Sequence, residues 1–315
     1  CFILAALASV VVHAWQTKEA TQFGQGLKQA WARLEIRGLL EDRGYANATK
    51  VPTDDDSMIT VGPKPDYPAD KRIVEIFEES LVERRHQVAL TALPMEQGEQ
   101  VIELTYRELS LLVIETANAA SALVPGEGMA ILLLQRSIAQ VVAIYGLLKA
   151  GIGCVPVDLD APFQRKEVVT RDSDASIIVS TPEEAALDLA RVFSLPLLQL
   201  PLTGKLGDLT VFQPATGGKA ELAADLPATT CTAKPKASDL AILLYTSGTT
   251  GVPKGIIYDH KHLLHGTWFF ADQCQMSTSS VALLKSPIIW AVVEWELFPA
   301  ILRGGRLVVG TPTAH

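Results

Sequence analysis

The sequence has few cysteines, and they do not form a metal-binding pattern. The four cysteines, Cys1, Cys154, Cys231 and Cys274, are far apart and contain no C-x-x-C pair among the 315 residues. Zinc sites and disulfide frameworks need closer or more numerous cysteines. The sequence therefore predicts neither, and it fits a reducing, cytoplasmic location.

Clusters of basic residues are also missing. The chain has 27 Lys and Arg against 35 Asp and Glu, which gives a formal net charge of −8. Proteins bind nucleic acids through clustered Lys and Arg, so we expect no nucleic-acid partner and favour small molecules or proteins. The content of 48% hydrophobic and 20% charged residues is ordinary for a globular chain with room for roughly two domains.

The N-terminal stretch CFILAALASVVVHAW (1–15) has no charged residue, yet it is shorter than the roughly 20 residues that span a bilayer as a helix. We interpret it as a helix that is buried or faces a partner. The tail of a truncated membrane segment or signal peptide is the less favoured alternative, and membrane contact of residues 1–15 would follow from it. Because the chain begins with Cys1, we expect residues upstream of it.

Three histidines lie in HKHLLH, where His262 and His265 would share one face of a helix. Such a pair is a weak signal for a metal. We favour solvated or locally hydrogen-bonded histidines and predict no metal site.

Apolar patterns divide the chain. Residues 25–43 predict a helix, so residues 1–49 form a helical segment of unknown role. Residues 50–68 contain four prolines and an acidic run, which indicates a linker and a domain boundary.

Beyond the linker, helices and buried strands alternate. We expect helices over 73–85, 108–124 and 137–151, the last closed by Gly151, and strands over 129–135, 154–158, 175–181 and 239–245. Residues 195–238 are interpreted as irregular. Alternation of this kind predicts an α/β fold with mainly parallel sheets flanked by helices. In such sheets ligands bind at the carboxyl ends of the strands.

The stretch LLYTSGTTGVPKG (243–255) follows the last of these strands. Glycines let backbone amides approach an anion, hydroxyls add donors, and a lysine adds charge, so the composition is that of a phosphate-binding loop. It differs from the Walker motif, in which the lysine lies directly after Gly and before Ser or Thr. Here Lys254 follows Pro253 and precedes Gly255.

TSGTTGVPKG resembles the signature loop of the adenylate-forming (ANL) superfamily, which includes adenylation domains of nonribosomal peptide synthetases, acyl-CoA synthetases and luciferases. The resemblance implies that the loop holds the β- and γ-phosphates of ATP while a carboxylate attacks the α-phosphate. The residues that match it are Thr246, Ser247, Gly248, Thr249, Thr250, Gly251 and Lys254.

Four further stretches resemble peptide-synthetase adenylation domains in particular. They are DYPADKRIVEIFEES (66–80), LTYREL (104–109), LLKAGIGCVPVDLDAP (147–162) and LLKSPIIWAVVEWELFPAILRGGRLVV (283–309). The resemblance runs from about Asp66 to the last residue. It implies that residues 69–315 are a partial adenylation (AMP-binding) domain, the truncated N-terminal portion of the large domain.

In amino-acid-activating members the last of these motifs has an aromatic residue followed by an aspartate that pairs with the substrate's α-ammonium. The matching positions here are Trp290 and Ala291, and by the same matching Val292 and Trp295 line the pocket. A methyl group cannot neutralise a buried ammonium, so we expect a carboxylic acid without an α-amine. A shifted alignment, pairing by Glu294, or a degenerated domain are the alternatives. Glu296 receives no catalytic role.

The resemblance also implies what the chain does not contain. In the family an adenine-stacking residue, an acidic Mg²⁺ ligand, an aspartate for the ribose and a lysine on a mobile domain follow later, and the sequence stops at His315 before them. We therefore expect no complete catalytic set in this chain, a Mg²⁺ ligand beyond its end, and an acceptor phosphopantetheine on a carrier protein domain. An acyl-CoA ligase fragment and a non-catalytic remnant that binds a nucleotide or a partner are the alternatives.

Overall fold

The chain divides into two units, Cys1–Asp66 and Tyr67–His315. The computed structural model describes residues 49–52, 58–61, 66–94, 100–201, 207–213, 218–221, 231, 233, 235–236, 238–246 and 253–310. The predicted helix over 25–43 and the uncharged stretch 1–15 lie outside these residues.

In the first unit, strands β1 (Thr49–Pro52) and β2 (Met58–Val61) form an antiparallel pair, with Thr49 opposite Val61. Both strands fall within or at the edge of the predicted linker over 50–68, so part of that stretch is regular. The boundaries 1–49, 50–68 and 69–315 stay a prediction.

The second unit is built around a sheet of eight strands. They are β5 (Gly128–Leu133), β6 (Ile152–Pro156), β7 (Ile177–Ser180), β8 (Leu197–Gln199), β9 (Thr210–Gln213), β10 (Gly218–Glu221), β11 (Leu240–Thr246) and β12 (Lys254–Asp259). Their order across the sheet is β10-β9-β8-β7-β5-β6-β11-β12. The run from β8 to β11 is parallel, and the outer strands β10, β9 and β12 are antiparallel to their neighbours.

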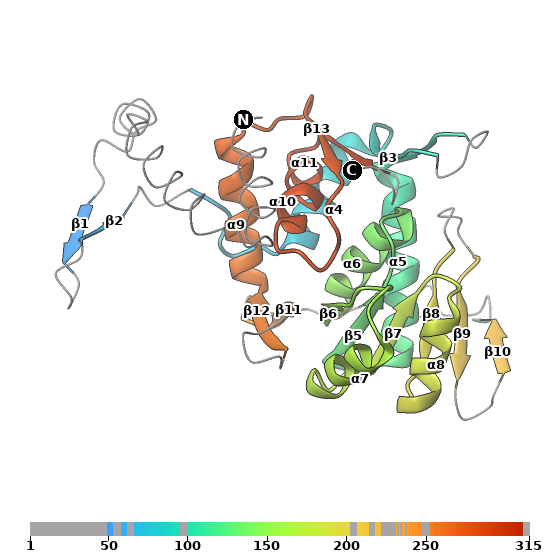
Figure 1. Ribbon diagram of the computed structural model, residues 1–315. Coiled ribbons are helices and arrows are strands. Elements are labelled where there is room, and N and C mark those ends of the chain that lie inside the picture. Colours follow the sequence, from blue (N-terminus) through green and yellow to red (C-terminus); the bar gives the residue numbers. More distant parts are fainter. Residues whose placement is uncertain are drawn as a thin grey trace. The chain divides into compact units, whose positions relative to one another are not determined.

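Helices cover both faces of this sheet. The helices of the unit are α4 (Ile73–Arg84), α5 (Tyr106–Leu123), α6 (Ile138–Ala150), α7 (Phe163–Asp172), α8 (Glu184–Phe193), α9 (His260–Gln273), α10 (Val293–Leu297) and α11 (Pro299–Leu302). Side chains alternate between the two faces along a strand. In β5, Ala130 and Leu132 pack with α5 and α6, whereas Ile131 and Leu133 pack with α7 and α8 on the other face. Figure 1 shows α7 and α8 together on their side of the sheet.

Local sequence explains where the two central helices begin and end. Thr105 caps α5 in a capping box: its hydroxyl accepts the N–H of Glu108, whose carboxylate accepts the N–H of Thr105 at 2.8 Å. Helix α6 ends at Gly151, which takes the left-handed conformation with φ of 73°. None of the helices in the described part of the chain is both long and apolar enough to cross a membrane.

A second sheet of four strands packs on the α5 side, in the order β13-β14-β3-β4. Its strands are β3 (Val88–Ala92), β4 (Ile102–Thr105), β13 (Val281–Leu284) and β14 (Arg306–Val309). The buried Tyr106 at the start of α5 connects α5 to the region of α11, because its hydroxyl donates to the carbonyl oxygens of Ile301 at 3.0 Å and Gly305 at 2.8 Å. Residues almost 200 positions apart are thereby joined.

The predicted α/β fold with mainly parallel sheets and flanking helices is confirmed. The prediction that residues 195–238 are irregular was wrong, because β8, β9 and β10 all lie there. These strands are three or four residues long. Such short runs, between prolines and glycines, are too brief to establish a recognisable period.

Candidate functional site

Hairpin β11–β12 carries both ends of the predicted phosphate loop. Thr246 ends β11 and Lys254 begins β12, and the two lie opposite each other in the antiparallel register. The hydroxyl of Thr246 donates to the carbonyl oxygen of Lys254 at 3.4 Å, and both residues are exposed. The remaining candidates, Ser247, Gly248, Thr249, Thr250 and Gly251, lie outside the described residues, so their role stays a prediction.

Thr246 and Lys254 share one face of the hairpin with residues farther along it. Side chains two apart in a strand point to the same face, and directly opposed residues of an antiparallel pair do so too. Thr246 therefore shares a face with Leu244 and Ile242, and Lys254 shares it with Tyr258, which is opposite Ile242. Four residue steps along the strand separate the two ends, a span of about 13 Å.

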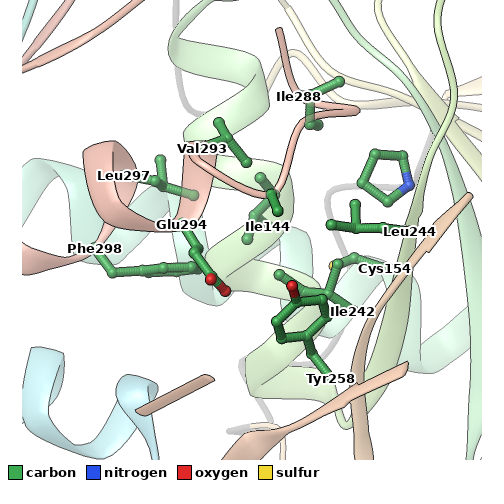
Figure 2. Close-up of a pocket in the computed structure, with 12 residues that line it drawn as sticks. Ile144, Cys154, Ile242, Leu244, Tyr258, Ile288, Val293, Glu294, Leu297 and Phe298 are labelled. Atoms are coloured by element: carbon green, nitrogen blue, oxygen red, sulfur yellow. The ribbon is translucent and has the colours of Figure 1, made fainter. Parts of the chain in front are cut away.

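That face borders a small cavity between the hairpin and α10 (Figure 2). Its volume is about 10 Å³, the space of one water molecule. The described residues that line it are Ile144, Cys154, Pro156, Ile242, Leu244, Tyr258, Ile288, Ala291, Val293, Glu294, Leu297 and Phe298. Almost all of the wall is hydrocarbon, apart from Tyr258, Glu294 and the buried Cys154 thiol.

Glu294 is the one carboxylic acid among the described residues of this wall. It is 9% exposed, and its carboxyl has no hydrogen bond or ion pair with a described residue. Burial penalises the charged form and raises the pKa of Glu294 to about 7. The same carboxyl helps to raise the pKa of Tyr258, although burial of the phenol is the larger cause.

Of the four predicted acid-pocket residues, Ala291 borders the cavity. It lies in the turn that leads into α10, whose first hydrogen bonds include Glu294 N–H to the Ala291 carbonyl oxygen at 3.4 Å. Trp290, Val292 and Trp295 do not line this cavity. Trp295 is 38% exposed, and its ring stacks on Phe270 of α9 with centroids 5.6 Å apart. The pocket role of these four residues stays a prediction.

Glu296 holds the backbone that leads to this turn. Its carboxylate accepts the N–H groups of Lys285 at 2.9 Å and Ser286 at 2.8 Å, and the hydroxyl of Ser286 at 2.7 Å. These bonds fix the segment that leaves β13 and reaches Ala291. Glu296 therefore positions the candidate site without facing the cavity.

The described residues fit one of the expected ligands, the phosphates of ATP. The exposed Lys254 ammonium and Thr246 hydroxyl are the charge and donor that ATP phosphates require. For Mg²⁺, no group of three or more His, Cys, Asp or Glu side chains able to hold a metal occurs in the part of the chain that the structure describes. That region includes His262 and His265 of α9.

Sequence reasoning overlooked Tyr258 and gave Glu294 only a minor place. Tyr258 lies four residues after Lys254, and this even spacing in a strand was a usable signal that both face one side. Glu294 stands in the middle of the apolar pattern WAVVEWELF, where a buried acid is itself a signal of function. The sequence did not indicate that residues of β12 and α10 line the same cavity.

Comparisons with known proteins find related sequences and folds. A family model described as "AMP-binding enzyme" matches residues 77–315. Among curated proteins, the chain is 28% identical over 247 residues to gramicidin S synthase 1 of Brevibacillus brevis, a match that covers 78% of the chain and 20% of the relative. It is 32% identical over 245 residues to tyrocidine synthase 3 of Brevibacillus parabrevis, covering 77% and 3%.

Among solved structures, the nonribosomal peptide synthetase FmoA3 in its AMPPNP-bound form has a TM-score of 0.61 at 19% identity, covering 80% of this chain and 24% of that one. This likeness concerns the fold. The chain spans 20% and 3% of the length of the two curated relatives.

Proposed function

Because the chain belongs to the AMP-binding enzyme family, we propose that it is part of an adenylation domain that activates a carboxylic acid with ATP. One carboxylate oxygen of the acid attacks the α-phosphorus of ATP. The bond from that phosphorus to the oxygen bridging the β-phosphorus breaks, and pyrophosphate leaves with the electron pair. The products are an acyl-AMP and pyrophosphate.

One observation supports this proposal: the face of hairpin β11–β12 that carries Thr246 and Lys254 borders, toward its other end, the cavity that Ala291 lines. The phosphate-binding pair Thr246 and Lys254 is at one end of that face, and Tyr258 beside the Ala291 turn is at the other. The span of about 13 Å suits a nucleotide's phosphates at one end and a carboxylic acid at the other. In this arrangement Lys254 supplies a point charge that neutralises phosphate oxygens.

The substrate class follows from Ala291. An α-ammonium beside this residue would have no ionised partner at that position, and burial of an unpaired charge costs several kcal/mol. We infer an acid that lacks an α-amine: a 2-oxo, 2-hydroxy, aryl or fatty acid. The alternative is that Glu294 pairs with an amine. Burial, which raises the pKa of the Glu294 carboxyl to about 7, disfavours the ionised carboxylate that such a pair needs.

The acceptor of the acyl group is a phosphopantetheine thiol on a carrier protein domain. The thiol sulfur attacks the acyl carbonyl carbon, a thioester forms, and AMP leaves. Two findings support this acceptor: the curated relatives are synthases by name, and four stretches of the sequence resemble peptide-synthetase adenylation domains. Free coenzyme A, as in an acyl-CoA ligase, is the competing acceptor.

ATP–pyrophosphate exchange tests the proposal. We expect the complete protein, purified from its source, to exchange labelled pyrophosphate into ATP in the presence of an acid without an α-amine. We expect the 315-residue polypeptide alone not to do so, because the preorganised charge that the reaction needs is incomplete in it. A complete protein that exchanges with no carboxylate contradicts activation, and robust exchange by the polypeptide contradicts the second expectation.

A further inference from the structure

We propose that Glu294 and Tyr258 form a polar pair that binds the 2-oxygen of a 2-oxo or 2-hydroxy acid. The inference rests on the proposed function and narrows its substrate class. It makes Glu294 a specificity-determining residue, one helical turn away from Ala291. Three features of the cavity carry it.

The first feature is position. Residues three apart in a helical turn are neighbours on its surface, and Ala291 and Glu294 both line the cavity. The side chain of Ala291 brings only a methyl group to this wall. Figure 2 shows the carboxyl of Glu294 and the hydroxyl of Tyr258 directed toward the same space, from α10 and β12 respectively.

The second feature is size and chemistry. The cavity of about 10 Å³ accommodates one oxygen-sized group. Among the described residues that line it, only Glu294 and Tyr258 carry side-chain oxygen atoms. A hydrocarbon chain entering here would leave both polar groups unpaired, whereas a carbonyl or hydroxyl oxygen would pair with them.

The third feature is charge. Ile144 of α6 and Ile242 and Leu244 of β11 bring no charge to the wall, and the other titratable groups that line it are the Tyr258 phenol and the Cys154 thiol, whose pKa values burial raises. With the Glu294 carboxyl protonated below about pH 7, the wall is neutral. A protonated carboxyl donates a hydrogen bond to a carbonyl oxygen and also accepts one from a hydroxyl, but it does not neutralise an ammonium.

The test measures, by calorimetry at pH 6, how tightly the 315-residue polypeptide binds acids that share one carbon skeleton. The probes are 4-methyl-2-oxopentanoate, 2-hydroxy-4-methylpentanoate, leucine and 4-methylpentanoate, with the corresponding 3-phenylpropanoates as a second set. We expect the 2-oxo and 2-hydroxy acids of at least one set to bind about fivefold or more tightly than their amino and unsubstituted counterparts.

Variants identify the residues responsible. Glu294→Leu should remove the preference for a 2-oxygen, Glu294→Gln should retain it because the amide donates and accepts, and Tyr258→Phe should weaken it. The exposed Glu184→Gln on α8 is the matched control and should change nothing. Infrared spectra give a readout independent of binding: a protonated carboxyl band at pH 6 should be absent in Glu294→Gln and shift when the 2-oxo acid is added.

Three results would overturn the inference. The first is tighter binding of the amino acids than of the other acids at pH 8, with this preference lost in Glu294→Gln. The second is a preference for a 2-oxygen that survives Glu294→Leu. The third is that none of the probes binds. Failure of the proposed function is distinguishable. A complete protein that lacks ATP–pyrophosphate exchange while the polypeptide keeps the Glu294-dependent preference refutes adenylation alone.

Discussion

Two buried titratable groups, His260 and Glu294, should oppose each other in the pH dependence of stability. His260 is 2% exposed at the start of α9, and its Nδ1 has no hydrogen-bond partner among the described residues. Burial, with the positive charge of Arg72 as a smaller cause, lowers the pKa of His260 from 6.5 to about 4. Burial raises the pKa of Glu294 from 4.5 to about 7.

The signs follow from linkage. The folded state keeps His260 neutral, so the free energy of unfolding falls as pH drops from 6.5 toward 4. The folded state keeps Glu294 protonated, so the free energy of unfolding falls as pH rises from 4.5 through 7. Each slope is about 1.4 kcal/mol per pH unit and each total is about 3 kcal/mol. Between pH 4.5 and 6.5 the two slopes have opposite signs and cancel.

Single substitutions should expose one slope at a time. The difference in free energy of unfolding between Glu294→Gln and wild type should shift in favour of the variant by about 3 kcal/mol from pH 4.5 to 7.5. His260→Gln should show the reverse trend, gaining relative to wild type as pH falls from 6.5 to 4. Urea unfolding followed by tryptophan fluorescence measures both, where unfolding is a single transition.

Taking differences between variant and wild type removes the contribution of the other titratable groups, which both proteins share. Glu184→Gln, on the exposed face of α8, should track wild type across the range. A difference curve for Glu294→Gln that stays level from pH 4.5 to 7.5 would refute the reasoning, because it would mean that burial does not hold this carboxyl protonated.

Three other substitutions test the site and the fold. In the complete protein, Lys254→Ala should lower ATP–pyrophosphate exchange about a hundredfold without changing the thermal midpoint. Lys261→Ala, at another exposed lysine, should leave exchange unchanged. Loss of folding with normal turnover per folded molecule would contradict the role of Lys254. Ala291→Asp should allow exchange with an α-amino acid and disfavour acids without the amine; an unchanged acid profile would argue against the substrate class. Tyr106→Phe should lower the free energy of unfolding by about 1–3 kcal/mol, because the buried carbonyl oxygens of Ile301 and Gly305 lose the phenol donor, although Ile301 keeps the N–H of Gly304. An unaltered denaturant midpoint would contradict that.

The central strands β5, β7 and β11 of the larger sheet were predicted from the sequence, because each is a short apolar run. The helix end at Gly151 was predicted because a left-handed turn depends on the local residue type, whereas the predicted start at residue 108 missed the capping box at Thr105. The strands β8 to β10 were missed because nothing in three or four residues distinguishes a strand from a loop.

The candidate site was predicted in two separate halves. The loop at Thr246 and the turn at Ala291 each had a recognisable composition, yet their common face depends on the register of β11 with β12 and on where α10 packs. Register and packing are set by contacts between distant residues, which no local pattern encodes. For the same reason the meeting of Tyr258 with Glu294, 36 positions away in the sequence, required a structure.

Among the described strands, β12 is the last of the larger sheet and pairs only with β11. Ile256 is 45% exposed and Ile257 is 67% exposed on it. An open apolar edge of this kind invites another strand to add to it, and the backbone it would grip is the one that carries Lys254. Self-association of the polypeptide through β12 would place a second copy beside Lys254, so aggregation and loss of nucleotide binding should appear together as its concentration rises.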